Sequence, residues 1–203
     1  MAEHAQPDRQ SWTVTLVCGA SGVGKSSIAI PLAARYGVPL AEADDIVTAL
    51  QALTTPQQSP MLHYWSTHPE AQSWAPERIA ELHFAVADAL RPGVEAVIAD
   101  HIKFGAPVVF EGDYLVPELA DGFGGAARAV VLGEPDDERI TANLRARESD
   151  RGDQRHRARV STLVGAQLTK RANAVGMPVV PARPWHDGLD RVDRALRGWR
   201  RSA

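Results

Sequence analysis

The chain has 203 residues, a formal net charge of −3 at pH 7 and a hydrophobic fraction of 44%. This length allows one substantial core, so we expect one domain over residues 13–203 behind a flexible N-terminal arm at residues 1–12. The slightly negative net charge argues against a nucleic-acid binder. No apolar run is long enough to cross a membrane and no signal peptide is recognisable, so we expect a cytoplasmic protein without membrane contact. A single cysteine excludes an internal disulfide.

The first predicted elements are a strand at residues 13–18, a glycine-rich loop and a helix at residues 26–36. The loop reads GASGVGKS, from Gly19 to Ser26, and fits the pattern G-x-x-x-x-G-K-[ST] without a gap. Backbone N–H groups of such a loop wrap a polyphosphate, and the following helix adds the positive end of its dipole. The strand and helix on either side make a chance match a poor explanation, so we expect a nucleoside triphosphate here.

Each residue type in the loop has a physical role. Lys25 is expected to reach the terminal phosphates as a catalytic residue, and Ser26 to coordinate the Mg²⁺ that accompanies a nucleotide. The glycines permit a close backbone approach that a side chain would block. The nucleotide-binding residues predicted in this segment are Gly19, Ala20, Ser21, Gly22, Val23, Gly24, Lys25, Ser26 and Ser27.

A short second strand is predicted at residues 39–43, with Asp44 and Asp45 at its end and a helix from about residue 46. A carboxylate just past a strand, near a phosphate loop, can orient an acceptor hydroxyl or take its proton. We expect Asp44 to face the acceptor in this role, with Asp45 as the alternative and both binding substrate. The pair could instead cap the helix, although a cap needs only one carboxylate.

Residues 54–76 form a long connection rich in Pro, Gln, Ser, His and Trp, which we call the acceptor-side insertion. Its rings could wall a substrate pocket or cap the core. They are His63, Tyr64, Trp65, His68 and Trp74. The histidine spacing fits no zinc pattern. From Pro76 a helical pattern continues to Pro92 and Gly93, where the helix is either kinked or followed by a second one, and His83 within it is predicted to be a packed or surface residue.

The third strand, APVVFEG, ends in a second acidic group. Glu111 and Asp113 follow its apolar residues, and both are predicted to bind substrate. Glu111 is the better candidate for the Mg²⁺ side, together with Ser26. Two more strands, ARAVVLG and MPVVPAR, alternate with helices at residues 136–148, 155–175 and 189–199. Alternation of this kind predicts an α/β fold with a parallel sheet covered on both faces and ligands at the carboxyl ends of its strands.

Arginines are dense over residues 145–159, which we call the lid segment. A phosphoryl-transfer site needs positive charge and the exclusion of water, and guanidinium groups bind oxygen atoms in pairs. We expect Arg145 and Arg151 to be catalytic and Arg147 to bind the nucleotide. Arg183, in ARPWHDG, is expected near the nucleotide base. For any single arginine, a solvated helix surface with ordinary ion pairs is an open alternative.

With these motifs in this order, the chain resembles the nucleoside-monophosphate-kinase-like group of P-loop small-molecule kinases. It looks most like the kinase domain of 2-phosphoglycerate kinases, on GASGVGKSSIAIPLA and VVFEGDYLVPEL, and chloramphenicol phosphotransferase follows a similar plan. The resemblance implies a P-loop NTPase fold with three α/β/α layers, a five-stranded parallel sheet and an Arg-rich lid. It also implies ATP, Mg²⁺ and transfer of the terminal phosphate to a small acceptor. Ser27 stands where that family usually has Thr.

The acceptor is left open between a 2-phosphoglycerate-like metabolite and another hydroxyl compound, such as an antibiotic or a sugar. The competing hypothesis is a P-loop ATPase or nucleotide-dependent switch that acts on a protein partner. The chain carries no Asn-Lys-x-Asp string of the common GTPases and no ABC-type SGG signature, and both observations lower this hypothesis. The choice between ATP and GTP, and between a monomer and a homodimer, stays open.

Overall fold

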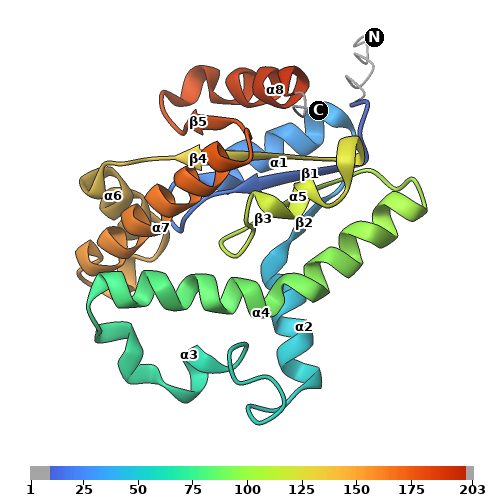
Figure 1. Ribbon diagram of the computed structural model, residues 1–203. Helices are drawn as coiled ribbons and strands as arrows, with labels where there is room; N and C mark the ends of the chain where they lie inside the picture. The colour runs from blue at the N-terminus through green and yellow to red at the C-terminus, as the bar shows by residue number, and fades with distance from the viewer. Residues whose placement is uncertain (1–9, 200–203) are drawn as a thin grey trace.

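Five short apolar segments form the strands of one parallel sheet in the order β2-β3-β1-β4-β5 (Figure 1). They are β1 (Val14–Cys18), β2 (Leu40–Glu42), β3 (Val108–Gly112), β4 (Ala127–Gly133) and β5 (Val179–Pro181). The computed structural model describes residues 10–199. Every residue of β1 and β3 is buried, as expected for strands with both faces covered. The predicted five-stranded parallel sheet is therefore confirmed.

Helices cover both faces of this sheet (Figure 1). On one face lie α1 (Lys25–Tyr36) and α8 (Gly188–Gly198), which contact each other. On the other lie α4 (Pro76–Lys103) and α7 (Arg155–Ala174), with α6 (Asp137–Arg147) packed against α7. The short elements of the described chain are α3 (Tyr64–Thr67), η1 (Pro69–Ser73), α5 (Glu118–Asp121), η2 (Gly124–Ala126), η3 (Ser149–Arg151) and η4 (Trp185–Asp187). The three layers expected from the sequence are thus present.

The carboxyl ends of all five strands meet at one edge, because every pairing is parallel. The glycine-rich loop leaves β1 at this edge, in the middle of the sheet, and β3 and β4 flank it. Ligands bind at such an edge, where neighbouring connections diverge to opposite faces. The fold therefore brings the loop together with whatever follows β2, β3, β4 and β5.

The second helix, α2 (Ala43–Leu53), begins earlier than the sequence predicts. Asp44 and Asp45 consequently lie in its first turn, rather than between strand and helix. The preceding residue, Glu42, makes no side-chain hydrogen bond to cap the helix. The helix starts at once because Ala43 is fully buried against Gly112 of the neighbouring strand, which leaves no room for a linker.

The helical pattern around Pro92 forms one continuous helix, α4, and not two. Proline lacks an N–H group and cannot donate to the carbonyl oxygen four residues earlier, which weakens the helix locally. Figure 1 shows that α4 changes direction about midway. Of the two alternatives left open by the sequence, the kinked helix is confirmed.

The flexible arm predicted for residues 1–12 falls mostly outside the described residues, and for Trp12 the prediction is wrong. Trp12 is 5% exposed, donates its Nε1–H to Thr15 at 2.7 Å and meets the ring of Tyr36 edge-on. The guanidinium of Arg128 lies over the Trp12 ring, 4.3 Å from the ring centre. A large aromatic side chain contributes too much buried area to remain in a mobile arm, so the packed domain includes Trp12.

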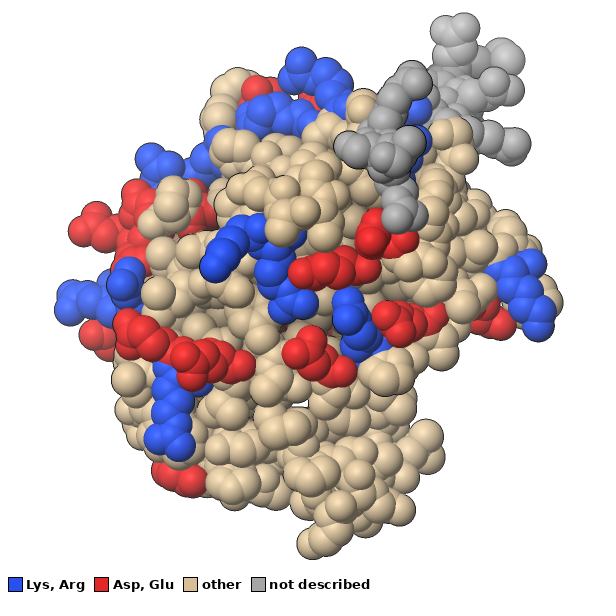
Figure 2. Space-filling model, viewed as in Figure 1, with Lys and Arg blue, Asp and Glu red and all other residues tan. Residues whose placement is uncertain are grey.

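The acceptor-side insertion lies beside α2 at the end of the molecule farthest from α8 (Figure 1). Residues 46–69 contain no Lys, Arg, Asp or Glu. Figure 2 shows this region as a tan surface, whereas charged side chains gather over the rest of the same face. Within residues 10–199, no helix combines the length and apolar character needed to cross a membrane.

The contact between Gly112 and Ala43 can be tested directly. A Cβ atom on Gly112 would lie 2.5 Å from the Ala43 Cβ, so Gly112→Ala should force β3 and the start of α2 apart. We expect the free energy of unfolding to fall by about 1–3 kcal/mol in urea titrations, as for other overpacked sites. Gly125→Ala, where no atom lies within 4 Å, is the control and should change it by less than about 0.5 kcal/mol. Equal effects would contradict this packing.

Candidate active site

The glycine-rich loop connects β1 to α1 through glycines in conformations that other residues rarely adopt. Gly22 and Gly24 have φ angles of 76° and 96°, and Gly24 is the residue that caps α1. A Cβ atom on Gly24 would also lie 2.1 Å from the indole ring of Trp185. Glycine is therefore needed at this position both for the backbone conformation and for the close approach of Trp185.

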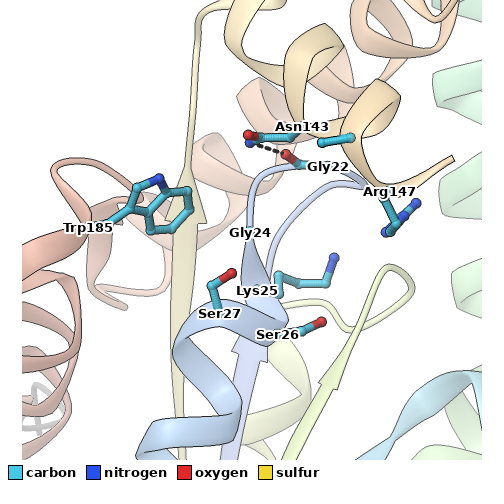
Figure 3. Close-up of a pocket in the computed structure, with 9 residues that line it drawn as sticks. Gly22, Gly24, Lys25, Ser26, Ser27, Asn143, Arg147 and Trp185 are labelled. Carbon is cyan, nitrogen blue, oxygen red and sulfur yellow. Dashed lines mark hydrogen bonds between the residues drawn. The ribbon is translucent and has the colours of Figure 1, made fainter. Parts of the chain in front are cut away.

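A cavity of about 340 Å³, the loop cavity, opens over this segment (Figure 3). It is lined by Gly22, Gly24, Lys25, Ser26, Ser27, Asn143, Ala146, Arg147 and Trp185. Asn143 Nδ2 donates to the Gly22 carbonyl oxygen at 2.8 Å, which fixes the loop to α6. Figure 3 shows Trp185 and Arg147 on opposite sides of the loop, with Lys25 and Ser26 between them. The predicted nucleotide-binding segment thus borders a real cavity.

Lys25 is 7% exposed and forms an ion pair with Asp113. Its ammonium group also donates to the Ala20 carbonyl oxygen at 3.2 Å. Burial alone would raise the pKa of Asp113, but the charge and the hydrogen bond of Lys25 outweigh burial and hold that pKa below its usual value. Asp113 therefore stays ionised and holds the lysine at the mouth of the loop.

A second cavity of about 360 Å³, the carboxylate cavity, adjoins the first and shares Lys25, Ser26 and Arg147 with it. It is further lined by Glu42, Asp44, Glu111, Gly112 and Asp113. Burial raises the pKa of Asp44, and the neighbouring Asp113 carboxylate raises it further. Asp45, in the same helical turn, does not line this cavity. Of the two aspartates, Asp44 is therefore the one placed to contact a molecule in the carboxylate cavity.

The expected Mg²⁺ ligands lie together. The Ser26 hydroxyl donates to Glu111 Oε1 at 2.5 Å, so two hard oxygen donors meet at the start of α1. No group of three or more His, Cys, Asp or Glu side chains that could hold a metal occurs among residues 10–199. Mg²⁺ commonly takes one or two protein ligands and completes its shell with water and phosphate oxygens. The residues present fit an ion that arrives with a nucleotide.

Only one arginine of the lid segment lines the loop and carboxylate cavities. Arg147 borders both and donates to Ser21 Oγ at 3.3 Å. Asn143 and Arg147 are four residues apart in α6 and share the helix face toward the loop, whereas Arg145 points elsewhere. Arg145 lines a separate cavity and pairs with Asp153 at 3.3 Å. The structure therefore does not bring Arg145, predicted to be catalytic, to the loop.

Arg151 and Arg183 line neither the loop cavity nor the carboxylate cavity. Arg151 lines a third, larger cavity and pairs with Glu148 at 3.1 Å. Arg183 donates to Asn143 Oδ1 at 3.2 Å, and its guanidinium lies 5.1 Å from the centre of the Trp185 ring. Arg183 thus supports the wall that Asn143 and Trp185 form, and does not itself line the loop cavity.

The sequence interpretation did not name Asn143, and it included Trp185 only as part of ARPWHDG. His83, predicted to be a packed or surface residue, is packed against Tyr114. His83 Nε2–H donates to the Asp113 carbonyl oxygen at 2.9 Å, and its ring stacks on Tyr114 at 4.8 Å. Burial lowers the pKa of His83, which therefore remains neutral beside Lys25. Trp185 follows the β5 strand, so the rule that ligands bind at strand ends could have drawn attention to it. For Asn143, inside a regular helix, no local signal exists.

Comparison with known proteins identifies a family and relatives for this chain. A family model described as an AAA domain matches residues 14–174. A curated 2-phosphoglycerate kinase of Methanococcus maripaludis is 30% identical over 116 residues, which make up 52% of this chain and 37% of that protein. The chain therefore spans little more than a third of the length of this relative. The resemblance to P-loop small-molecule kinases that the sequence indicates is confirmed.

Two solved structures share the fold over nearly their whole length. The protein TT1252 from Thermus thermophilus superposes with a TM-score of 0.55 at 17% identity, covering 93% of this chain and 97% of that one. A gluconokinase from Sinorhizobium meliloti gives a TM-score of 0.51 at 18% identity, covering 94% and 92%. At such low identities, the likeness concerns the fold alone.

The ion pair at the mouth of the loop makes a titration prediction. In Lys25→Ala the ammonium group that lowers the Asp113 pKa is gone while the burial that raises it remains, so this pKa should rise relative to the unchanged protein. Carboxyl ¹³C NMR over a pH series measures the shift. Ser26→Ala is the control, because Ser26 bonds to Glu111 and not to Asp113. An unchanged Asp113 pKa in Lys25→Ala would contradict the pairing.

Proposed function

We propose that this chain, which belongs to the AAA domain family, is a small-molecule kinase that transfers the terminal phosphate of ATP to a hydroxyl acceptor. One observation carries the proposal. Lys25 and Ser26 of the phosphate loop share a cavity with Arg147 and with carboxylates that follow the second and third strands. Binding of a nucleotide would not by itself require the Asp44 carboxylate, whereas a transfer reaction needs a group that handles the acceptor proton.

On the nucleotide side, the loop amides and Lys25 bind the phosphates. Arg147, which lines both cavities, neutralises charge on the group in transit. Trp185 forms the outer wall, supported by Arg183, and we place the nucleoside against it. Ser26 and Glu111 would hold Mg²⁺, which offsets phosphate charge when bound. Lys25 exchanges its contact with Asp113 for the terminal phosphates when they arrive.

On the acceptor side, Asp44 orients the hydroxyl group and accepts its proton. Its raised pKa suits a base that must take up a proton during the reaction. Asp113 keeps Lys25 in place, and the Asp113 main chain is held in turn by His83. Residues around the reacting atoms thus divide into a group that holds phosphate and a group that handles the acceptor.

The relatives support a kinase without identifying the acceptor. The curated relative is named a 2-phosphoglycerate kinase and one structural neighbour a gluconokinase, and both names describe phosphate transfer to a small hydroxyl compound. For this chain we propose an acceptor in the same broad range, from a 2-phosphoglycerate-like metabolite to an antibiotic or a sugar. A nucleotide-dependent switch with a protein partner is the outcome that would replace the proposal.

The base assignment predicts a pH dependence. Asp44 must be ionised to take a proton, and its pKa is raised, so turnover should fall as pH decreases through a pKa above the ordinary aspartate value of 3.8. Asp44→Asn should lower kcat by about 100-fold or more, remove this acid limb and leave the affinity for a fluorescent ADP analogue nearly unchanged.

Asp45→Asn is the matched comparison for Asp44, because it lies in the same turn outside the cavity. Both variants are assayed by ADP release with an acceptor. If Asp45→Asn lost most of its turnover while Asp44→Asn kept it, Asp45 and not Asp44 would be the base. If Asp44→Asn lost only folding stability, the aspartates would serve to cap the helix.

The lid segment gives a second comparison. Arg147→Ala should reduce kcat at least about tenfold, because it removes positive charge that lines both cavities. Arg145→Ala, two residues away and paired with Asp153 outside them, should retain most of the turnover. Steady-state kinetics of the two variants, with unchanged circular dichroism, measures this. The reverse ranking would show that the lid segment closes with another face toward the loop.

A further inference from the structure

A third cavity of about 750 Å³, the aromatic cavity, lies between the acceptor-side insertion, the lid segment and α7. Its side toward the insertion includes Trp65 and Tyr114, and its side toward the lid segment includes Arg151, His156 and Arg157. We propose that this cavity holds the body of the acceptor and selects an alcohol that carries both a ring and a carboxylate. The inference rests on the proposed kinase function and deepens it by naming the class of acceptor.

The aromatic cavity is next to the reacting groups. Ser21 lines it, and the Ser21 hydroxyl accepts a hydrogen bond from Arg147, which borders both the loop and the carboxylate cavity. Tyr114 lines it too and directly follows Asp113, the partner of Lys25. A molecule in the aromatic cavity can therefore present a hydroxyl group toward the carboxylate cavity while its body remains outside the nucleotide site.

The wall toward the insertion is a fixed aromatic surface. Trp65 Nε1–H donates to the Tyr114 hydroxyl at 3.0 Å, and the Tyr114 ring stacks on His83 at 4.8 Å. Because the indole N–H is already used, Trp65 offers a ligand its ring and not a donor. Burial raises the pKa of Tyr114 to about 12, so the phenol stays neutral. Such a wall contacts a ring well and leaves a small acyclic acid with unfilled space.

The wall toward the lid segment supplies positive charge. Glu148 pairs with Arg147 at 2.7 Å, with Arg157 at 2.7 Å and with Arg151 at 3.1 Å, and hydrogen bonds from Arg157 and Arg147 lower its pKa to about 2. One ionised carboxylate thus faces three guanidinium groups, of which those of Arg151 and Arg157 line the aromatic cavity. This leaves an excess of positive charge for an anionic ligand.

One further carboxylate, Asp153, also lines the aromatic cavity. It already pairs with Arg145 at 3.3 Å and with Arg155 at 3.7 Å. The insertion residues that line this cavity, Trp65, Gln72 and Ser73, carry no charge, and residues 46–69 form the tan region of Figure 2. The two walls therefore differ in chemistry, and they favour a ligand with a ring at one side and a carboxylate at the other.

Calorimetric titration of the full chain in the presence of ADP and Mg²⁺ tests the proposed class of acceptor with three probe compounds. The probe 3-(hydroxymethyl)benzoate has a ring and a carboxylate, 1,3-benzenedimethanol keeps the ring without the charge, and 2-phosphoglycerate keeps charge without a ring. We expect the first to bind at least about tenfold more tightly than either of the others, which corresponds to one good ionic or aromatic contact. Equal or tighter binding of the neutral diol or of 2-phosphoglycerate would overturn the inference.

Variants separate the two walls. Trp65→Leu should lower the affinity for 3-(hydroxymethyl)benzoate about fivefold or more. Trp65→Phe should retain most of the affinity, because an aromatic ring is still present. Arg157→Gln should lower the affinity for 3-(hydroxymethyl)benzoate but not the affinity for 1,3-benzenedimethanol, which has no charge. Arg159→Gln is the control, since Arg159 lies on the same helix, pairs with Asp137 and does not line the aromatic cavity. Unchanged affinity in both Trp65→Leu and Arg157→Gln would exclude this cavity.

A separate titration with a fluorescent ADP analogue distinguishes the failure of this inference from the failure of the kinase proposal. If the analogue binds the unchanged protein, Lys25→Ala weakens it, and acyclic acceptors alone stimulate ADP release, the acceptor class is wrong and the kinase proposal stands. If the analogue does not bind, both are overturned.

Discussion

Lys25 and Asp113 form the contact on which the other parts of the site depend, because it ties the phosphate loop to the residues that follow β3. Lys25 is buried, and a buried ammonium group without a partner would destabilise the fold. Asp113 supplies that partner, and its main chain is held by His83 from α4. A lysine that is already charged and oriented needs little rearrangement to meet phosphate oxygens.

The order and direction of the strands place the other site residues around this ion pair. The parallel strands deliver Asp44, Glu111 and the phosphate loop to one edge, and α6 covers the loop with Asn143 and Arg147. The cavities over the loop and around the carboxylates share residues, so phosphate and acceptor can meet without a large movement of the sheet. The acceptor-side insertion lies outside the sheet and reaches the site through the hydrogen bond from Trp65 to Tyr114.

How far the sequence predicts this site depends on how local each signal is. The phosphate loop was predictable because one short pattern determines both its backbone and its chemistry, and the rule for strand ends added Asp44 and Glu111. The arginines were not, because the phase of α6 relative to the loop decides that Arg147 and not Arg145 faces it. Trp185 follows β5, where the rule for strand ends applies, but its close contact with Gly24 is long-range and could not be predicted from local sequence.

The central claim is phosphate transfer to a small molecule, and ADP release measures it most directly. The full chain is assayed with ATP and Mg²⁺ alone, and then with a panel of phosphorylated acids, cyclic hydroxy acids, sugars, nucleosides and antibiotics. The account predicts slow hydrolysis alone and strong stimulation by one class of acceptor, with the phosphorylated product found by mass spectrometry. Hydrolysis that no acceptor changes, but that a protein partner accelerates, would contradict it.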